Sequence, residues 1–516
     1  MRNIITILLA SLVVSTCFAI PARKGAFIYT TADGVEQEVY LHGDEFFHYL
    51  TDSEGNWLDE STLLPLTNEE QSLRRSQGQR RAQARRAKQA QSIERLLASK
   101  GIIILVSYSD ESFQSSLSDM KDWAMGNQYT YNGATGSVRQ YFLDQSWGSY
   151  DMQIDVYGPV TVSKEASYYG KNDRYGNDLH ADELVVEACK LAAAQGADFS
   201  QYDSNNDGYV DWVVVLYAGR GEADGGSEST IWPHQWDLSE TNKTFKLNGK
   251  TINHYCCLNE IDSESNKRCG IGTFCHEFSH IMGLPDLYET NYNPTGVHTL
   301  MEWDVMDYGP YNNNGNTPPA YSAYERWFMG WLQPTLVNSA ISVTLPDINS
   351  SKAAVLMTET GQNVTDILNP NPNTFYLFEN RQKIGWDRYL PGNGMLITKI
   401  KFNYNDWYYN EVNNSSSNMG VDLMEARTNT SNYGKSNDAY PAGSTSFTKN
   451  TNYTVTNISL TDGIIHFDVN GGGQSLVLGL EDIEYCESTQ KILLDGQLYI
   501  IRNDVIYDLS GRIVQF

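Results

Sequence analysis

Continuous apolar runs and helical repeats alternate through the middle of the chain. Residues 102–106 and 212–219 are runs of aliphatic and aromatic side chains, which predict strands buried on both faces. Residues 179–194 repeat apolar side chains at helical spacing, and a shorter helix is predicted at residues 274–282. Strands that alternate with helices predict an α/β (α+β) domain over residues 101–335.

The flanking segments have different patterns. Residues 20–66 alternate apolar and polar side chains around turns, which predicts a small β-rich unit. Residues 336–470 contain short alternating strands between Asn, Gly and Ser turns, and they predict a β-sandwich-like domain. The three glycines at 471–473 and the alternating residues after them predict a linker and a small β-tail over residues 471–516.

The N-terminus has the pattern of a signal peptide. Residues 1–19 combine a charged start, a short apolar stretch and small residues ending at Ala19. The apolar stretch is too short to span a bilayer, and no other segment predicts a stable transmembrane span. Cys17 raises the alternative of a lipoprotein, which Thr16 before it disfavours. We expect a secreted protein, located outside the cell or on a bacterial cell surface.

A basic segment follows the first β-rich unit. Residues 67–100 are rich in Arg, Gln and Ala and include three Arg–Arg pairs. This composition predicts an exposed helical linker that a trypsin-like protease can cut. Residues 20–100 are therefore a candidate propeptide, and we expect a zymogen that such a protease activates. A solvated basic helix without any role in activation is the plainer alternative.

The overall charge is strongly negative. The 516 residues include 63 acidic and 37 basic side chains, which gives a net charge of -26. This excess disfavours nucleic acid as a partner, because phosphate binding needs a basic surface. The acidity favours solubility outside the cell, and some of the carboxylates are candidate calcium ligands.

The sequence H-E-F-S-H at residues 276–280 is the strongest chemical signal. Residues i and i+4 of a helix lie on one face, so His276 and His280 can offer their imidazoles to one zinc ion. Glu277 can reach the zinc-bound water, take its proton as it attacks a peptide carbonyl, and pass the proton to the leaving amine.

The residues after His280 make the motif more specific. Gly283 lets the chain turn sharply after a short helix, and Asp286 can then return toward the metal as a third ligand. Glu302 is the alternative third ligand. The extended spacing is rarer than an isolated H-E-x-x-H. We therefore expect a zinc hydrolase rather than an ordinary helix that happens to carry these side chains.

Residues 302–309 resemble the Met-turn of metzincins. In such a turn a methionine forms an apolar floor below the zinc, so Met306 is the candidate for that position. Tyr308, two residues later, is a candidate donor to the transition-state oxyanion. Buried methionines and surface tyrosines are common without these roles, so the prediction depends on the zinc motif before it.

A second, weaker motif predicts calcium. Asp203, Asn205, Asp207 and Asp211 follow the pattern D-x-N-x-D-G-x-x-D, which matches the first part of a calcium-binding loop. The bidentate glutamate of such loops is missing, because Val214 occupies its position. A turn rich in Asp and Asn that binds no calcium is the equal alternative.

Six cysteines follow the predicted signal peptide, and four of them lie between residues 256 and 275. Export permits disulfides, so a local disulfide beside the zinc motif is one expectation. Buried free thiols are the other.

Taken together, these stretches resemble the immune-inhibitor-A-type secreted metallopeptidases of bacteria. The segments that carry the resemblance are 202–219, 231–236, 272–288, 303–309, 379–382 and 390–394. The resemblance implies a signal, an N-terminal propeptide, a metzincin-like catalytic domain with structural calcium, and a following β-domain. It also implies zinc bound by His276 and His280, with Glu277 as the catalytic residue. Residues 493–512 resemble the C-terminal sorting tails of type-nine secretion cargo in Gram-negative bacteria.

The expected function is that of a secreted zinc endopeptidase that hydrolyses extracellular proteins. A cell-surface adhesin with an inactive protease-like core would also explain the β-domain and the tail. Intact His276, Glu277 and His280 argue against this alternative. A zinc hydrolase acting on an amide other than a peptide is the third possibility.

Overall fold

The computed structural model describes residues 20–31, 33–89, 100–173, 176–292, 299–427, 434–448 and 452–479, and four short strands between 490 and 514. The predicted signal peptide and Cys486 lie outside these residues. Among the helices described, none is both long and apolar enough to cross a membrane.

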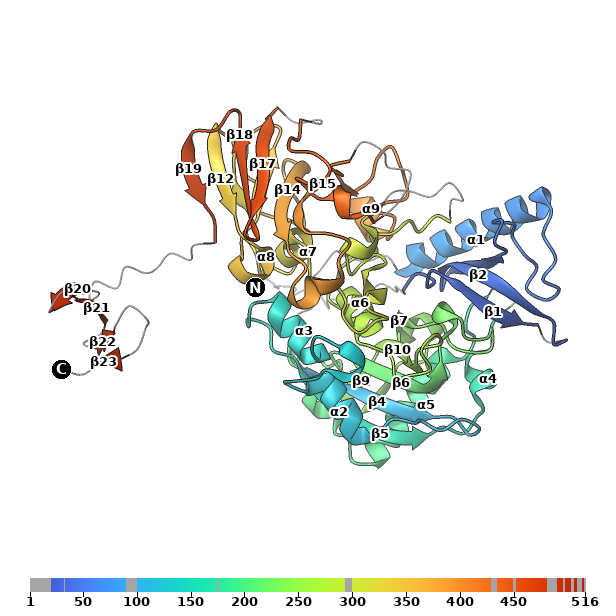
Figure 1. The fold of residues 1–516 in the computed structure, drawn as a ribbon. Coiled ribbons are helices and arrows are strands. Elements are labelled where there is room, and N and C mark those ends of the chain that lie inside the picture. The colour runs from blue at the N-terminus through green and yellow to red at the C-terminus, as the bar shows by residue number, and fades with distance from the viewer. Residues whose placement is uncertain are drawn as a thin grey trace, which may run out of the picture.

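A five-stranded sheet forms the centre of the middle domain, in the order β5-β4-β6-β10-β7 (Figure 1). Its strands are β4 (Lys100–Ser107), β5 (Gln153–Thr161), β6 (Val213–Arg220), β7 (His234–Asp237) and β10 (His254–Ile261). β5, β4, β6 and β10 are parallel, and β7 pairs antiparallel to β10 at the edge. The apolar runs at 102–106 and 212–219 lie in β4 and β6 and are buried along most of their length, as expected for strands covered on both faces.

Helices and one small hairpin complete this domain. They are α2 (Leu117–Met125), α3 (Val138–Gln145), α4 (Ala166–Tyr169), α5 (Ala181–Ala194), α6 (Gly272–Ile281), α7 (Ala323–Phe328), β8 (Phe245–Leu247) and β9 (Lys250–Ile252). Sequence signals explain where the helices begin. The Ser116 hydroxyl accepts from the Asp119 N–H at the start of α2, and Ser322 and Glu325 form a capping box at α7. α5 and α6 lie where helical spacing predicts them.

The candidate propeptide packs against the middle domain. It contains the antiparallel sheet β1 (Ala26–Thr30), β2 (Glu36–Asp44) and β3 (Phe47–Thr51), and the basic segment forms α1 (Asn68–Gln89). Phe47 and Trp57 belong to the same hydrophobic cluster as the central sheet. The unit is therefore docked on the middle domain (Figure 1).

Two sheets form the β-domain, in the orders β11-β13-β14-β15-β16 and β17-β18-β12-β19. Their strands are β11 (Thr335–Leu336), β12 (Ile341–Leu345), β13 (Val355–Thr358), β14 (Thr374–Arg381), β15 (Gly394–Lys401), β16 (Val421–Leu423), β17 (Val455–Thr461), β18 (Ile464–Val469) and β19 (Gln474–Val477). Short helices α8 (Ile348–Ser351) and α9 (Tyr404–Tyr408) accompany them. β19 pairs with β12, so the second sheet continues beyond residue 470.

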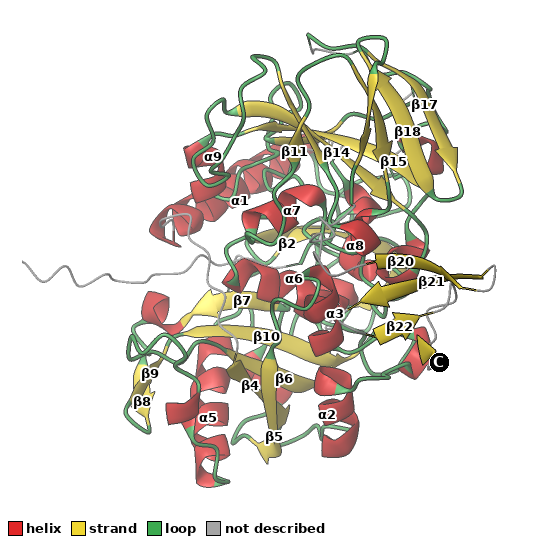
Figure 2. Cartoon of the chain, turned by 90° about the vertical axis from the view of Figure 1, so that its left-hand side faces the viewer, coloured by secondary structure: helices red, strands yellow, loops and turns green. Residues whose placement is uncertain are grey.

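Strand β14 joins the β-domain to the middle domain. Phe375 and Leu377 belong to the hydrophobic cluster of the central sheet, whereas Tyr376 and Phe378 belong to the cluster between the two β-sheets. This alternation explains why β14 reads as a continuous apolar run, because both of its faces are buried. α6 lies between the central sheet and the β-domain (Figure 2).

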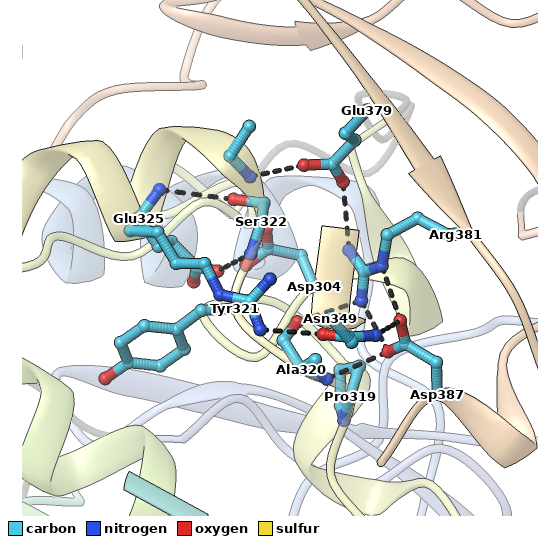
Figure 3. A network of polar contacts seen from close by, with 12 residues as sticks. Asp304, Pro319, Ala320, Tyr321, Ser322, Glu325, Asn349, Glu379, Arg381 and Asp387 are labelled. Carbon is cyan, nitrogen blue, oxygen red and sulfur yellow. Dashed lines mark hydrogen bonds and ion pairs between the residues drawn. The ribbon is translucent and has the colours of Figure 1, made fainter. Parts of the chain in front are cut away.

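A buried polar network reinforces this junction (Figure 3). Arg381 on β14 donates to Glu379 at 3.0 Å, to Asp387 at 2.6 Å and to the Ala320 carbonyl at 2.9 Å. Burial alone would lower the pKa of Arg381, but Asp387 and Glu379 raise it well above its ordinary value. The guanidinium therefore stays charged, and losing either carboxylate would leave a costly buried charge. Asp304 of the predicted Met-turn lies in the same region (Figure 3).

The last strands form a separate ladder. β20 (Gln490–Leu494), β21 (Gln497–Arg502), β22 (Val505–Tyr507) and β23 (Ile513–Val514) pair antiparallel in sequence order. Antiparallel pairing of this kind agrees with the alternating pattern of the predicted β-tail.

Candidate metal centre

Helix α6 carries the H-E-F-S-H motif in the interior of the protein. His276 and Glu277 are fully buried, and His280 is 3% exposed. The helix ends at Ile281, and Gly283 follows with a φ of 102°, a conformation that favours glycine. The Gly283 N–H donates to the His280 carbonyl at 2.8 Å. This turn brings Asp286 back toward the helix face that carries both histidines.

Three ligand atoms meet at this turn. His276 Nε2 and His280 Nε2 are 3.0 Å apart, and Asp286 Oδ1 lies 3.2 Å and 3.3 Å from them. In a tetrahedral zinc site with bonds of about 2.0–2.1 Å, neighbouring ligand atoms are about 3.3–3.4 Å apart. The triangle therefore has the size that zinc requires. Within the described part of the chain, these three residues are the one such group of potential metal ligands.

Backbone carbonyls fix the orientation of both imidazoles. His276 Nδ1–H donates to the Val305 carbonyl and His280 Nδ1–H donates to the Leu284 carbonyl, each at 2.8 Å. Both Nε2 lone pairs then point toward Asp286 Oδ1, which has no hydrogen-bond donor among the described residues. Burial lowers the pKa of His280 to about 4, which favours the neutral, metal-binding form. Three electron-rich atoms so close together fit a bound cation.

A residue of the β-domain orients the third ligand. Asn410 follows α9, and its Nδ2 donates to Asp286 Oδ2 at 2.6 Å. Its Oδ1 accepts from the Asp286 N–H at 2.8 Å. This pair of bonds holds one carboxylate oxygen and turns the other toward the histidines. Sequence reasoning missed Asn410, which is 124 residues away from Asp286. A φ of 54°, which asparagine tolerates, is the one local signal.

We expect Asn410→Ala to weaken zinc binding by about 10- to 100-fold, as losses of outer-shell partners do. Competition with a chromogenic chelator measures the affinity. Asn414→Ala is the matched control. Asn414 accepts a hydrogen bond from the Thr290 N–H at 2.7 Å, four residues after Asp286, but it does not contact a metal-ligand residue. Equal zinc affinity of Asn410→Ala and the unaltered protein would show that the hydrogen bonds of Asn410 to Asp286 are dispensable.

Glu277 lies beside the ligand group with a perturbed carboxyl. Its Oε1 accepts from the Ile20 N–H at 2.7 Å, and its Oε2 accepts no hydrogen bond from the described residues. Burial raises the pKa of Glu277 well above its ordinary value, and the charges of Glu45 and Asp286 raise it further. A buried carboxyl of this kind is suited to proton transfer.

The predicted Met-turn connects the two halves of the ligand group. The Val305 carbonyl binds His276, and the Met306 carbonyl accepts from the Leu287 N–H at 2.8 Å, next to Asp286. Met306 is fully buried, and its N–H donates to Asp304 Oδ1 at 2.8 Å. The turn thus supports both ligand segments, while the position of Met306 as an apolar floor stays a prediction.

Tyr308 and Glu302 lie beside the candidate propeptide. Lys24 Nζ is 3.9 Å from the centre of the Tyr308 ring, and the same ammonium lies 3.5 Å from Glu302. Burial raises the pKa of Tyr308 above its ordinary value, so its hydroxyl stays protonated. Glu302 is outside the ligand group, and the geometry favours Asp286 over it as the third ligand.

The start of the candidate propeptide covers the centre. The Ile20 carbonyl accepts from Trp232 Nε1 at 3.1 Å, and the Pro21 carbonyl accepts from the Tyr311 hydroxyl at 2.7 Å. Ile20 itself is 1% exposed. With this segment in place, a substrate has no access to Glu277.

The predicted calcium loop binds a lysine. Asp203 Oδ2 lies 2.5 Å from Lys250 Nζ, and Asp203 Oδ1 accepts from the Asp207 N–H at 3.0 Å. Asn205 Nδ2 donates to Asp207 at 2.8 Å, and Asp211 accepts from a backbone N–H of the same loop at 3.1 Å. These contacts describe a turn rich in Asp and Asn, with Lys250 as the counter-charge.

The expected local disulfide is wrong for the described cysteines. Those five are all free thiols: Cys189, Cys256, Cys257, Cys269 and Cys275. Burial raises the pKa of each thiol above its ordinary value, which keeps it protonated and unreactive.

Comparisons with known proteins agree with this centre. Residues 97–334 match the family model described as immune inhibitor A peptidase M6, catalytic domain. The pre-pro-metalloprotease PrtV of Vibrio cholerae serotype O1 (strain M66-2) is 29% identical over 231 residues, which cover 39% of this chain and 24% of that protein. Immune inhibitor A of Bacillus thuringiensis subsp. alesti is 29% identical over 256 residues, covering 44% of this chain and 36% of that protein.

The chain therefore spans between 24% and 36% of the length of these relatives. The matched segment contains the whole ligand group as well as Glu277, and it ends before the β-domain that supplies Asn410. Residues 97–334 therefore resemble the catalytic domain of immune inhibitor A (peptidase M6) metallopeptidases.

Proposed function

We propose that the chain is a secreted zinc endopeptidase, made as a zymogen, that hydrolyses peptide bonds of extracellular proteins. The observation that carries the proposal is the triangle of His276, His280 and Asp286 with Glu277 beside it. Neutral imidazoles and one carboxylate are ligands that zinc prefers, and three protein ligands leave a position open. A metzincin-like architecture is part of the same proposal.

The proposed chemistry assigns a step to each side chain. Zinc, when bound, would supply Lewis acidity and lower the pKa of a coordinated water. Glu277 accepts a proton from the attacking water and then delivers it to the leaving amine nitrogen. The Ile20 amide nitrogen, 2.7 Å from Glu277 Oε1, marks the place of that leaving nitrogen. Tyr308 donates a hydrogen bond to the developing oxyanion once Lys24 has left its ring.

Residues 20–100 are proposed as a propeptide that keeps the enzyme latent by filling the cleft. Ile20 and Ala22 pack with Trp232 and Ala223 in one hydrophobic cluster, which excludes water and substrate from Glu277. A trypsin-like protease is the proposed activator. Arg75 lies 5.0 Å above the Trp57 ring inside α1, so we expect cleavage elsewhere in the basic linker.

A buried ion pair should make release of the propeptide depend on pH. His48 Nε2 lies 3.3 Å from Glu222 Oε1, and the ring stacks on Trp232. Burial alone would lower the pKa of His48, but Glu222 raises it from 6.5 to about 9. The pair therefore stabilises the bound propeptide fully below pH 6.5, and this stabilisation is lost as the pH rises through 9.

We expect trypsin-nicked protein to gain activity faster at pH 9 than at pH 6.5, with propeptide affinity falling by about 100-fold over that interval. The rise of peptidase activity after dilution measures this. His48→Gln should remove the pH dependence, whereas His42→Gln should keep it, because His42 contacts Thr51 within the propeptide. Identical pH profiles for the two variants would contradict the ion-pair explanation.

Export, calcium and sorting complete the proposal. The pattern of residues 1–19 supports export, and residues 471–516 are proposed as a tail that directs the protein to the bacterial cell surface. Structural calcium at Asp203, Asn205, Asp207 and Asp211 requires that the ion displace the Lys250 ammonium. Calorimetric titration of the metal-free protein with Ca²⁺ tests it, and Lys250→Ala should tighten any binding at this loop.

Casein hydrolysis by the trypsin-activated protein tests the function. We expect cleavage that a zinc chelator abolishes and that added zinc restores. Untouched casein, in a sample that has lost the propeptide and holds zinc, would favour the adhesin alternative. Chelator-sensitive hydrolysis of small amides without hydrolysis of casein would favour a zinc hydrolase with a non-peptide substrate.

A further inference from the structure

An acidic pocket beside the metal centre holds the side chain of Arg23. Arg23 Nη1 lies 2.5 Å from Asp262 Oδ2, and Nη2 pairs with Glu264 and donates to Asn314 Oδ1 at 3.3 Å. The Arg23 and Asp262 side chains are only 13% and 9% exposed. The third acid, Asp224, is only partly buried, and its charge acts on Arg23. Glu264, whose side chain is 67% exposed, lies at the rim, so Asp262 and Asp224 form the more enclosed part of the pocket around one guanidinium.

The pocket requires a cation. Burial alone would lower the pKa of Arg23, but Asp262, Glu264 and Asp224 together raise it above its ordinary value. Burial and the Asp262 charge raise the pKa of Asp224 to about 6, while hydrogen bonds from Ser263 and the charge of Arg23 oppose the rise. Without a cation, clustered carboxylates remain in a poorly solvated site, which is unfavourable. When Arg23 leaves with the propeptide, the pocket should accept another basic side chain.

The backbone around Arg23 fixes the position of this pocket relative to the reacting bond. The Ile20 nitrogen lies at Glu277, where a leaving amine would receive its proton. The chain then continues past Tyr311, which binds the Pro21 carbonyl, to Arg23, whose N–H donates to the Ala223 carbonyl at 2.8 Å. Ile20 therefore occupies the place of the first residue after the cleaved bond, and Arg23 that of the fourth.

We propose that Asp224, Asp262 and Glu264 form a substrate subsite for a basic side chain, with arginine preferred, at the fourth residue after the cleaved bond. The proposal rests on the proposed peptidase function. A planar guanidinium can pair with two carboxylates at once, which a lysine ammonium does less well. A cavity of about 500 Å³ lies between residues 23–28 of the candidate propeptide and a wall that includes Asp224 and Glu264.

The neighbouring Lys24 provides a contrast within the same segment. Its ammonium is 48% exposed and lies 3.5 Å from Glu302, which is 37% exposed. Exposed ion pairs of this kind contribute little binding free energy, because water screens the charges and both side chains lose conformational freedom. Glu302 is therefore a matched acidic residue near the cleft that should not select substrates.

The test uses quenched fluorescent peptides that differ only at the fourth residue after the cleaved bond, which mass spectrometry identifies. With the trypsin-activated protein, kcat/KM should follow the order Arg, Lys, Gln, Glu, and the arginine peptide should exceed the glutamine peptide by about tenfold. Asp262→Asn should bring that ratio close to one. Glu302→Gln should retain it.

Two results would overturn the proposal, and they differ from each other. Cleavage of the arginine and glutamine peptides at the same rate removes the subsite and leaves the peptidase function intact. Failure to cleave any peptide, after the propeptide has been lost and zinc has been loaded, removes the peptidase function and the subsite with it. The peptide comparison needs no variant, so it does not depend on how Asp262→Asn folds.

Discussion

Replacing Glu277 by glutamine should lower kcat for peptide hydrolysis by about 10³-fold or more, while the protein keeps its zinc. Glutamine has nearly the same shape, so the fully buried position remains filled. It cannot accept a proton from the attacking water, and removal of a positioned general base typically costs about 10²- to 10⁴-fold. Initial rates on a fluorescent peptide and zinc content by atomic absorption together measure the effect.

Glu45→Gln is the control for this substitution. Glu45 acts on the same carboxyl, because its charge helps to raise the pKa of Glu277, but it belongs to the candidate propeptide. After removal of the candidate propeptide, this variant should cleave peptides at the rate of the unaltered protein. A Glu277→Gln protein that retains normal kcat would remove Glu277 from the mechanism and move the base to another residue.

The second large effect is expected at the third ligand. Asp286→Ala should weaken zinc binding by more than about 100-fold, the upper limit for changes in outer-shell partners, because it removes a ligand directly. Burial by itself would raise the pKa of Asp286, but the two histidines lower it below its ordinary value, so an anion is present to bind the metal. Zinc retained after dialysis against a chelator measures the loss.

Glu302→Ala separates the two candidates for the third ligand. Glu302 lies outside the ligand group and pairs with Lys24, so its alanine variant should keep zinc with unchanged affinity. Loss of zinc in Glu302→Ala, with normal binding in Asp286→Ala, would reverse the assignment. Circular dichroism of both variants shows whether either change has unfolded the protein.

Local sequence rules predicted the part of the site that local geometry creates. His276 and His280 meet because the helical repeat places residues i and i+4 on one face. Asp286 joins them because Gly283 adopts a left-handed conformation directly after the helix. The apolar runs at residues 102–106 and 212–219 also predicted the central strands, because strands covered on both faces need apolar side chains throughout.

Contacts between distant segments could not be predicted in this way. Asn410 reaches Asp286 across 124 residues, and Ile20 reaches Glu277 across 257. Lys250, 47 residues from Asp203, changes the electrostatics of the predicted calcium loop. Each of these contacts depends on how whole elements pack, and neither helical nor strand periodicity carries that information. The N-terminal segment could be identified as a candidate propeptide, but not its position in the cleft.

The two hydrogen bonds between Asn410 and Asp286 also limit how the domains of such a protein can be exchanged. The segment matched by the family model ends at residue 334, yet one support of its metal centre comes from the next domain. A recombination event that exchanged the β-domain would have to deliver an amide to the same place. The metal centre therefore depends on both domains, although they have separate sheets.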